Sequence, residues 1–126
     1  MLDPAIADIH LGHLRHNARL LQQRAHPAEL LAVVKADAYG HGASAVVPVL
    51  QKAGVRWFAV ATLPEAIALR EQGLEENLLV FAAPLRAWLP HYTAHRLDCT
   101  IASRDLAEAA VALKQPLRVH LKVDTG

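Results

Sequence analysis

A lysine at the end of a short apolar run is the residue of this sequence best suited to chemistry. Leu31, Ala32, Val33 and Val34 precede Lys35, and an apolar run with two β-branched residues predicts a strand that is covered on both faces. Partial burial favours the neutral, nucleophilic form of a lysine amine, which can form a Schiff base with an aldehyde. The alternative is a buried lysine stem whose ammonium reaches solvent, and the apolar run alone favours that alternative.

The segment that follows Lys35 has the composition of a turn. Gly40 and Gly42 permit backbone conformations that are closed to other residues, and they let main-chain N–H groups approach an anion. Asp37 could serve as a general base beside the lysine. Its place in a turn favours hydrogen bonds to the backbone instead, and we expect that role. A Gly-x-Gly pattern by itself is a weak indication of an anion site.

The whole string from Ala32 to Gly42 is far more specific. Ala-Val-Val-Lys-Ala-Asp-Ala-Tyr-Gly-His-Gly closely resembles the pyridoxal-phosphate lysine motif of the alanine racemase family. The resemblance implies that Lys35 is catalytic and carries pyridoxal 5′-phosphate as an internal aldimine, and that the hydroxyl of Tyr39 lies near the cofactor phosphate. It also implies that two bases interconvert L-alanine and D-alanine. Lys35 is one base, and the other is a tyrosine from the C-terminal domain of a partner subunit, so the full-length protein is expected to be a homodimer.

A second segment with a lysine lies at the end of the sequence. Leu-Lys-Val-Asp-Thr-Gly, residues 121–126, resembles a family segment whose lysine is carbamylated in many members and orients an arginine toward the cofactor. By this resemblance Lys122 is a candidate for carbamylation.

At His10 the family usually has an acidic residue, which caps a helix better than histidine does. Further matches extend the resemblance over essentially the whole chain, at 11–17, 57–62 and 65–70.

Apolar spacing and capping signals divide the sequence into alternating strands and helices. Strands are predicted over 30–35, 57–61, 78–82, 97–102 and 117–123. Helices are predicted over 11–25, 44–52 and 104–114, with a short or broken helix within 85–96. Pro48 leaves open a start later than Ser44 for the second helix. Thr62 and Glu65 form a capping box that starts a helix running to Gln72, and Ser44 and Ser103 are expected to be helix caps.

Strands and helices that alternate in this way are typical of a parallel α/β fold. Five strands in 126 residues would fit an open, doubly wound sheet, whereas a closed eight-stranded barrel needs about 250 residues. The resemblance favours the barrel, because alanine racemases have an N-terminal barrel followed by a C-terminal β domain. We therefore expect a partial (β/α)8 TIM-type barrel with about five parallel strands. Residues 1–126 would be the N-terminal portion of the pyridoxal-phosphate-binding barrel domain, with the C-terminal β domain absent.

Composition argues against several other classes. The net charge is +1 and the basic residues are spread along the chain, so we expect no nucleic-acid partner. No apolar run is long enough to span a membrane, and the first residues do not resemble a leader peptide, so we expect no membrane partner and a cytoplasmic location. Cys99, the single cysteine, is expected to be a small apolar residue in a strand.

Three interpretations other than a racemase are a metal-binding protein, a non-enzymatic pyridoxal-phosphate-binding protein and an α/β module without a cofactor. His10, His13 and His16 recur at three-residue intervals, but no cysteine or carboxylate pair completes a tetrahedral set, so we expect no metal site. A non-enzymatic pyridoxal-phosphate-binding protein of the same barrel type remains open, although its lysine motif normally differs. An α/β module without a cofactor also remains open. If the chain is a racemase fragment, it lacks the second base and should have negligible activity alone.

Overall fold

The computed structural model describes residues 5–126 and contains alternating helices and strands, as the sequence predicts. All five predicted strands and all five predicted helical segments are present, with ends that differ by a few residues. One short helix, α2, was not predicted. In chain order the elements are α1 Leu11–Ala25, β1 Leu31–Val33, α2 Lys35–Tyr39, α3 Ala43–Lys52, β2 Trp57–Val60, α4 Leu63–Glu71, β3 Asn77–Val80, η1 Arg86–Trp88, α5 Leu89–Ala94, β4 Asp98–Ile101, α6 Arg104–Ala112 and β5 Arg118–Leu121.

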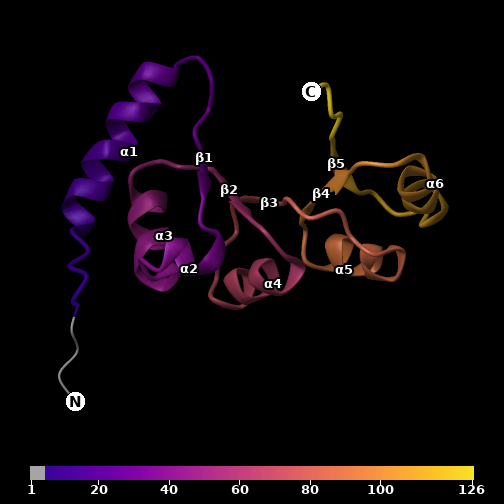
Figure 1. Ribbon diagram of the computed structural model, residues 1–126, viewed down its shortest axis with the longest axis horizontal. Helices are drawn as coiled ribbons and strands as arrows, with labels where there is room; N and C mark the ends of the chain where they lie inside the picture. Colours follow the sequence, from indigo (N-terminus) through magenta and orange to yellow (C-terminus); the bar gives the residue numbers. More distant parts are fainter. Residues whose placement is uncertain (1–4) are drawn as a thin grey trace.

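The five strands form one sheet in the order β1-β2-β3-β4-β5, and every neighbouring pair is parallel. Helices connect successive strands, and Figure 1 shows α3 to α6 following the row of strands while α1 lies beside its β1 end. A doubly wound sheet reverses its strand order at a switch point. The consecutive order found here is that of a (β/α)8 barrel, so the expected partial barrel is confirmed.

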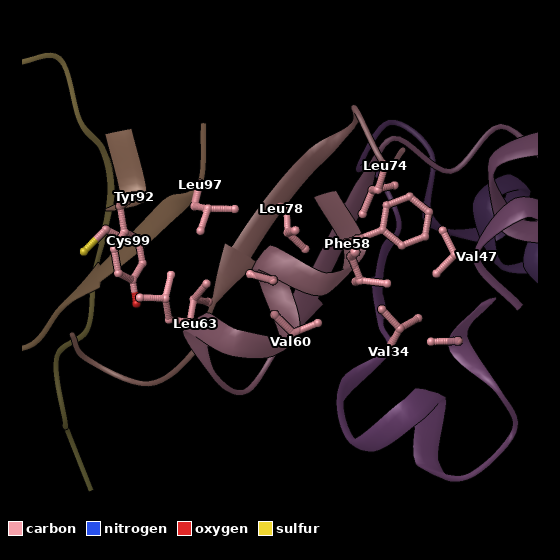
Figure 2. Close-up of a cluster of buried hydrophobic side chains, with 14 of the residues drawn as sticks. Val34, Val47, Phe58, Val60, Leu63, Leu74, Leu78, Tyr92, Leu97 and Cys99 are labelled. Carbon is pink, nitrogen blue, oxygen red and sulfur yellow. The ribbon is translucent and has the colours of Figure 1, made fainter. Parts of the chain in front are cut away.

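The core lies between the sheet and the helices that cover it. Phe58 and Val60 on β2, and Leu78 and Val80 on β3, are two residues apart on their strands and are at most 1% exposed. Side chains two apart share a face of a strand, and this face packs against the apolar sides of the helices. Figure 2 shows the resulting row of side chains, which runs from Val34, Val47 and Phe58 through Val60, Leu63 and Leu78 to Tyr92, Leu97 and Cys99.

Cys99 lies on β4 and is fully buried, as expected for a small apolar residue in a strand. Burial raises the pKa of its thiol to about 11. Tyr92 of α5 is also buried, and desolvation, with a smaller contribution from Cys99, raises the pKa of its phenol to about 12. Both side chains therefore remain neutral near pH 7 and contribute to the core by packing.

The prediction that the first strand is covered on both faces was wrong. Within residues 5–126, β1 pairs only with β2, and its three residues are half-buried because β1 is an edge strand of the described sheet. The N–H of Val34 donates to the carbonyl oxygen of Ala59 at 2.8 Å, which extends the parallel pairing by one residue. Lys35 is therefore not a strand residue. It is the first residue of α2, immediately after the last strand contact.

The second helix begins one residue before the predicted start at Ser44, so the later start that Pro48 left open does not occur, and the expected cap at Ser44 was wrong. Helix α3 begins at Ala43, and Pro48 lies inside it. The N–H of Ala43 donates to Oδ1 of Asp37 at 2.7 Å. A carboxylate from the preceding turn therefore accepts a hydrogen bond from an N–H group that has no partner inside the helix. Ser103 does cap α6, because its Oγ accepts a hydrogen bond from the N–H of Leu106 at 3.3 Å.

His10 occupies the N-cap position of α1 and makes no side-chain hydrogen bond to the helix, as expected for a poor cap. None of the helices among residues 5–126 is both long enough and apolar enough to cross a membrane.

Candidate functional site at the lysine turn

The backbone after Lys35 forms a left-handed helical turn. Ala36, Asp37, Ala38 and Tyr39 all have positive φ, between 49° and 57°. This conformation costs about 1–2 kcal/mol for each residue that is not glycine. The sequence predicted positive φ only at the glycines, since no local pattern in Ala-Asp-Ala-Tyr favours it. Four such residues in succession need compensating contacts from the rest of the molecule.

Backbone hydrogen bonds close the turn on itself. The N–H groups of Gly40, His41 and Gly42 donate to the carbonyl oxygens of Ala36, Ala38 and Asp37, at 3.0, 3.1 and 3.0 Å. These three N–H groups are therefore used inside the turn, and the anion site that the Gly-x-Gly pattern weakly indicated gains no support from them. Gly40 and Gly42, with φ of 79° and 83°, instead allow the chain to leave the turn and enter α3.

Two side chains of the segment reinforce the turn. Asp37 bonds the backbone, as expected, through the contact from its Oδ1 to the Ala43 N–H. Nδ1 of His41 lies 2.9 Å from the carbonyl oxygen of Ala38 and 3.2 Å from that of Tyr39. Carbonyl oxygens only accept hydrogen bonds, so this geometry requires a proton on Nδ1, and in a neutral ring Nε2 is then the acceptor.

A third side chain reaches the turn from the next unit of the fold. Oε1 of Glu65, in the first turn of α4, accepts a hydrogen bond from the N–H of Ala36 at 2.6 Å. Its Oε2 accepts from the N–H groups of Ala61 and Thr62 and from Oγ1 of Thr62, at 3.0, 2.8 and 3.0 Å. Partial burial alone would raise the pKa of Glu65, but these hydrogen bonds together hold it below its ordinary value. The sequence predicted the capping box but not the contact with Ala36.

Lys35 and Tyr39 lie together at the carboxyl end of β1. Lys35 is half-buried, and its Nζ lies 5.9 Å from the centroid of the Tyr39 ring, which is 58% exposed. In barrels of parallel strands, active sites are built from the segments that follow the carboxyl ends of the strands. The lysine and the tyrosine thus occupy the part of the fold where chemistry is expected.

Lys122 follows β5, at the same carboxyl ends of the strands where Lys35 follows β1. Its N–H donates to the carbonyl oxygen of Ile101 at 2.9 Å, and its side chain is exposed. Strands β2, β3 and β4 lie between β1 and β5 in the sheet, but side chains meet across its face, since the rings of Trp57 on β2 and His120 on β5 are 5.9 Å apart. The two lysines therefore follow the first and the last strand of one partial barrel.

A cavity of about 540 Å³ lies beside the turn, between α1 and the open edge of β1. Its polar lining includes His13, Asn17, Tyr39 and His41, while Lys35 is not among its lining residues. The rings of His10 and His13 are 5.0 Å apart. Within residues 5–126, no group of three or more His, Cys, Asp or Glu side chains is arranged to hold a metal ion.

Comparison with known proteins agrees with this arrangement. The family model for the alanine racemase N-terminal domain matches residues 9–126. The alanine racemase of Carboxydothermus hydrogenoformans is 39% identical over 98% of this chain and 34% of its own length. That of Acidithiobacillus ferrooxidans is 40% identical over the whole chain and 35% of its own length.

Solved structures show the same relationship. The crystal structure of alanine racemase from E. faecalis matches with a TM-score of 0.87 and 39% identity, over 94% of this chain and 33% of that one. A histidine racemase from Leuconostoc mesenteroides matches with a TM-score of 0.84 and 26% identity, over 92% of this chain and 32% of that one. The chain thus spans about a third of the length of the proteins it matches. By its sequence and its fold, the chain belongs to the alanine racemase N-terminal domain family.

Proposed function

We propose that this chain is the part of an amino-acid racemase that binds pyridoxal 5′-phosphate through Lys35, and that its substrate is alanine. The observation that carries the proposal is the placement of Lys35. Lys35 directly follows the last paired residue of edge strand β1, and its amine lies beside the ring of Tyr39. It is also attached to a left-handed turn that Asp37, His41 and Glu65 hold in place. Such support is expected where a reactive side chain must be aimed.

The amine and the phenol at the carboxyl end of β1 suit a phosphorylated aldehyde as ligand. Lys35 offers a primary amine, and Tyr39 offers an exposed phenol that we assign to the phosphate. Pyridoxal phosphate, when bound, supplies an electron sink that acidifies the Cα–H bond of an amino acid. Lys35 would hold the cofactor through its amine, and the same amine, when free, would move the proton on one face of the substrate Cα. The opposite base would come from outside these 126 residues, from a partner subunit.

Lys122 is proposed to have a supporting role. Carbamylation would replace the positive charge of its ammonium with a negative charge, which could orient a cationic side chain toward the cofactor. The exposed position of Lys122 after β5 leaves its amine accessible to carbon dioxide.

Alanine is favoured over other amino acids by the relatives at 39–40% identity, which are named alanine racemases. The histidine racemase shares the fold at lower identity, so the fold alone does not select the substrate. Rates for alanine and histidine, measured with the protein that the gene encodes, would decide between them. We expect alanine to react faster, and a preference for histidine would contradict the assignment.

The cofactor proposal is tested by covalent labelling. The protein is incubated with pyridoxal phosphate, reduced with borohydride and mapped by mass spectrometry. We expect the label on Lys35 and its loss in Lys35→Arg, which keeps the charge but removes the primary amine. Lys52→Arg is the matched control, because Lys52 is an exposed lysine at the end of α3, and it should leave labelling unchanged. Labelling at another lysine would contradict the proposal, and no labelling would favour an α/β module without a cofactor.

Because the chain spans about a third of its relatives, we propose that residues 1–126 alone lack racemase activity. Exchange of the alanine α-proton with deuterium, followed by NMR, should stay at the background rate for this chain. Exchange in the protein that the gene encodes should exceed background, which would also exclude a cofactor carrier without activity. Equal rates for the two would contradict the proposed division of the active site.

A further inference from the structure

Glu65 joins two segments that both follow strands of the sheet. Ala36 belongs to the turn after β1, whereas Ala61 and Thr62 follow β2, and all three donate their N–H groups to the same carboxylate. The contact between Ala36 and Glu65 spans 29 positions of the sequence and is the shortest of the three, at 2.6 Å. A charged acceptor strengthens each of these hydrogen bonds.

The contact with Ala36 bears directly on Lys35. The N–H of Ala36 lies in the same rigid peptide plane as the carbonyl group of Lys35. A hydrogen bond that fixes this N–H therefore fixes the ψ angle of Lys35. The ψ angle, together with the strand contact of the preceding Val34, sets the direction in which the Lys35 side chain leaves the backbone.

The two oxygens of Glu65 have separate partners, which lets the two roles be distinguished. Oε2 receives three donors from Ala61 and Thr62 and caps the start of α4, while Oε1 receives only the Ala36 N–H. Glutamine has the same shape but only one carbonyl oxygen. Its oxygen is best placed at the site with three donors, so its NH2 group would face the Ala36 N–H and the contact with Ala36 would be lost.

We propose that Glu65 is a positioning residue for Lys35, acting through the Ala36 N–H to aim the lysine side chain at the cofactor. The inference rests on the proposed binding of pyridoxal phosphate by Lys35. Glu65 contributes no group to the chemistry itself. Its carboxylate connects the turn that carries the lysine to the neighbouring β2–α4 unit, so that the lysine keeps one direction relative to the sheet.

The test compares three variants of the protein that the gene encodes. Glu65→Gln and Glu65→Asp should both lose the Ala36 contact, the first by the reversed polarity of the amide and the second because the side chain is one methylene shorter. Thr62→Val is the matched control: it removes the Oγ1 hydrogen bond to Oε2 but leaves the Ala36 contact. Amide hydrogen exchange, resolved to single residues in the absence of cofactor, reports on Ala36 directly. The apparent dissociation constant and the visible circular dichroism of bound pyridoxal phosphate report on Lys35.

We expect exchange at Ala36 to accelerate and the apparent dissociation constant to rise about tenfold or more in both Glu65 variants, as for loss of a hydrogen bond to a charged group. The visible circular dichroism should also change, because the chromophore is held differently. Thr62→Val should stay within about twofold of the wild type in both measurements. A merely structural role of Glu65 would lower the unfolding midpoint but leave the spectrum and the dissociation constant of the folded fraction unchanged, and that result would overturn the inference.

The outcomes separate the inference from the proposed function. If the wild-type protein is not labelled at Lys35, the proposed function fails, and the positioning role toward the cofactor falls with it. If the wild type is labelled and the Glu65 variants bind as tightly with the same spectrum, the proposed function stands and the inference fails. Unchanged exchange at Ala36 in the Glu65 variants would also overturn the inference, whatever the labelling shows.

Discussion

Asp37 stabilises both the turn after Lys35 and the helix that follows it. Its Oδ1 accepts a hydrogen bond from Ala43, the first residue of α3, and its carbonyl oxygen accepts one from Gly42. In Asp37→Ala the Ala43 N–H loses its partner, so we expect the free energy of unfolding to fall by about 1–2 kcal/mol in a urea titration. Asp37→Asn keeps an acceptor oxygen and should lose clearly less. Equal losses for the two variants would contradict the capping role.

Glu65 should make stability depend on pH in one direction. Partial burial acts to raise its pKa, but the hydrogen bonds from Ala36, Thr62 and Ala61 lower the net value below the ordinary one. The carboxylate therefore stabilises the folded state fully above the ordinary glutamate pKa, and this contribution disappears as the pH falls through the lowered value. We expect the difference in unfolding free energy between wild type and Glu65→Gln to be constant near neutral pH and to shrink below about pH 4. A difference that grows on acidification would disprove this.

At the scale of elements, α4 binds segments at both the carboxyl ends and the amino ends of the strands. Glu65, at the start of α4, binds the segments after β1 and β2. Arg70, near its end, donates to carbonyl oxygens of the segments that precede β3 and β4, namely those of Leu74, Glu76, His95 and Arg96, at 2.5, 2.9, 3.0 and 2.9 Å. Burial first, and then the nearby cations Arg96 and Arg118, lower the pKa of Arg70.

Replacement of Arg70 should therefore weaken the fold and leave the lysine turn in place. In Arg70→Met the four carbonyl oxygens lose the hydrogen bonds from Arg70, although that of Arg96 keeps one from Arg118. We expect the free energy of unfolding to fall by about 2–4 kcal/mol. Arg70→Lys should recover only part of the loss, because an ammonium group cannot reproduce the fork of the guanidinium. Arg104→Met, at an exposed position at the start of α6, is the control and should change the free energy by less than about 0.5 kcal/mol. Denaturant unfolding of the three variants measures these differences.

At the scale of the whole molecule, the sheet ends in two edges. Among the described residues, β1 and β5 each pair with one strand only. Near the second edge, Leu121 and Val123 are 75% and 74% exposed. Unpaired strand edges with apolar side chains promote association between chains. The homodimer and the cytoplasmic location inferred from the sequence stay predictions.

We expect residues 1–126 to self-associate through these edges. Sedimentation velocity should show species heavier than the monomer, and Leu121→Lys should reduce them, because a charge on an edge strand opposes pairing. Val111→Lys is the control, since Val111 is 80% exposed but lies on α6, away from the strand edge. A monodisperse wild-type monomer with one cooperative unfolding transition would contradict the expectation.

The outcomes for individual residues show which signals could be found in the sequence. The Thr62 and Glu65 capping pattern, the Ser103 cap and the broken helix around Pro90 were predicted because each depends on neighbours within a few positions. The start of α3 was predicted to within one residue, but its cap was missed because Asp37 lies six residues before Ala43 in a turn of unusual shape. The burial of β1 was overestimated because an apolar run cannot show that its strand lies at an edge.

The sequence by itself determined the alternation of strands and helices, the lysine motif and the family to which it points, because these depend on local spacing and on the string from Ala32 to Gly42. The family resemblance also favoured the barrel, which the strand order confirms. Only the tertiary structure decided the left-handed turn after Lys35 and the contact that holds it. Ala-Asp-Ala-Tyr has no local preference for positive φ. The conformation is stabilised by partners that only the folded chain brings together, of which Glu65, 29 residues from Ala36, is the most distant.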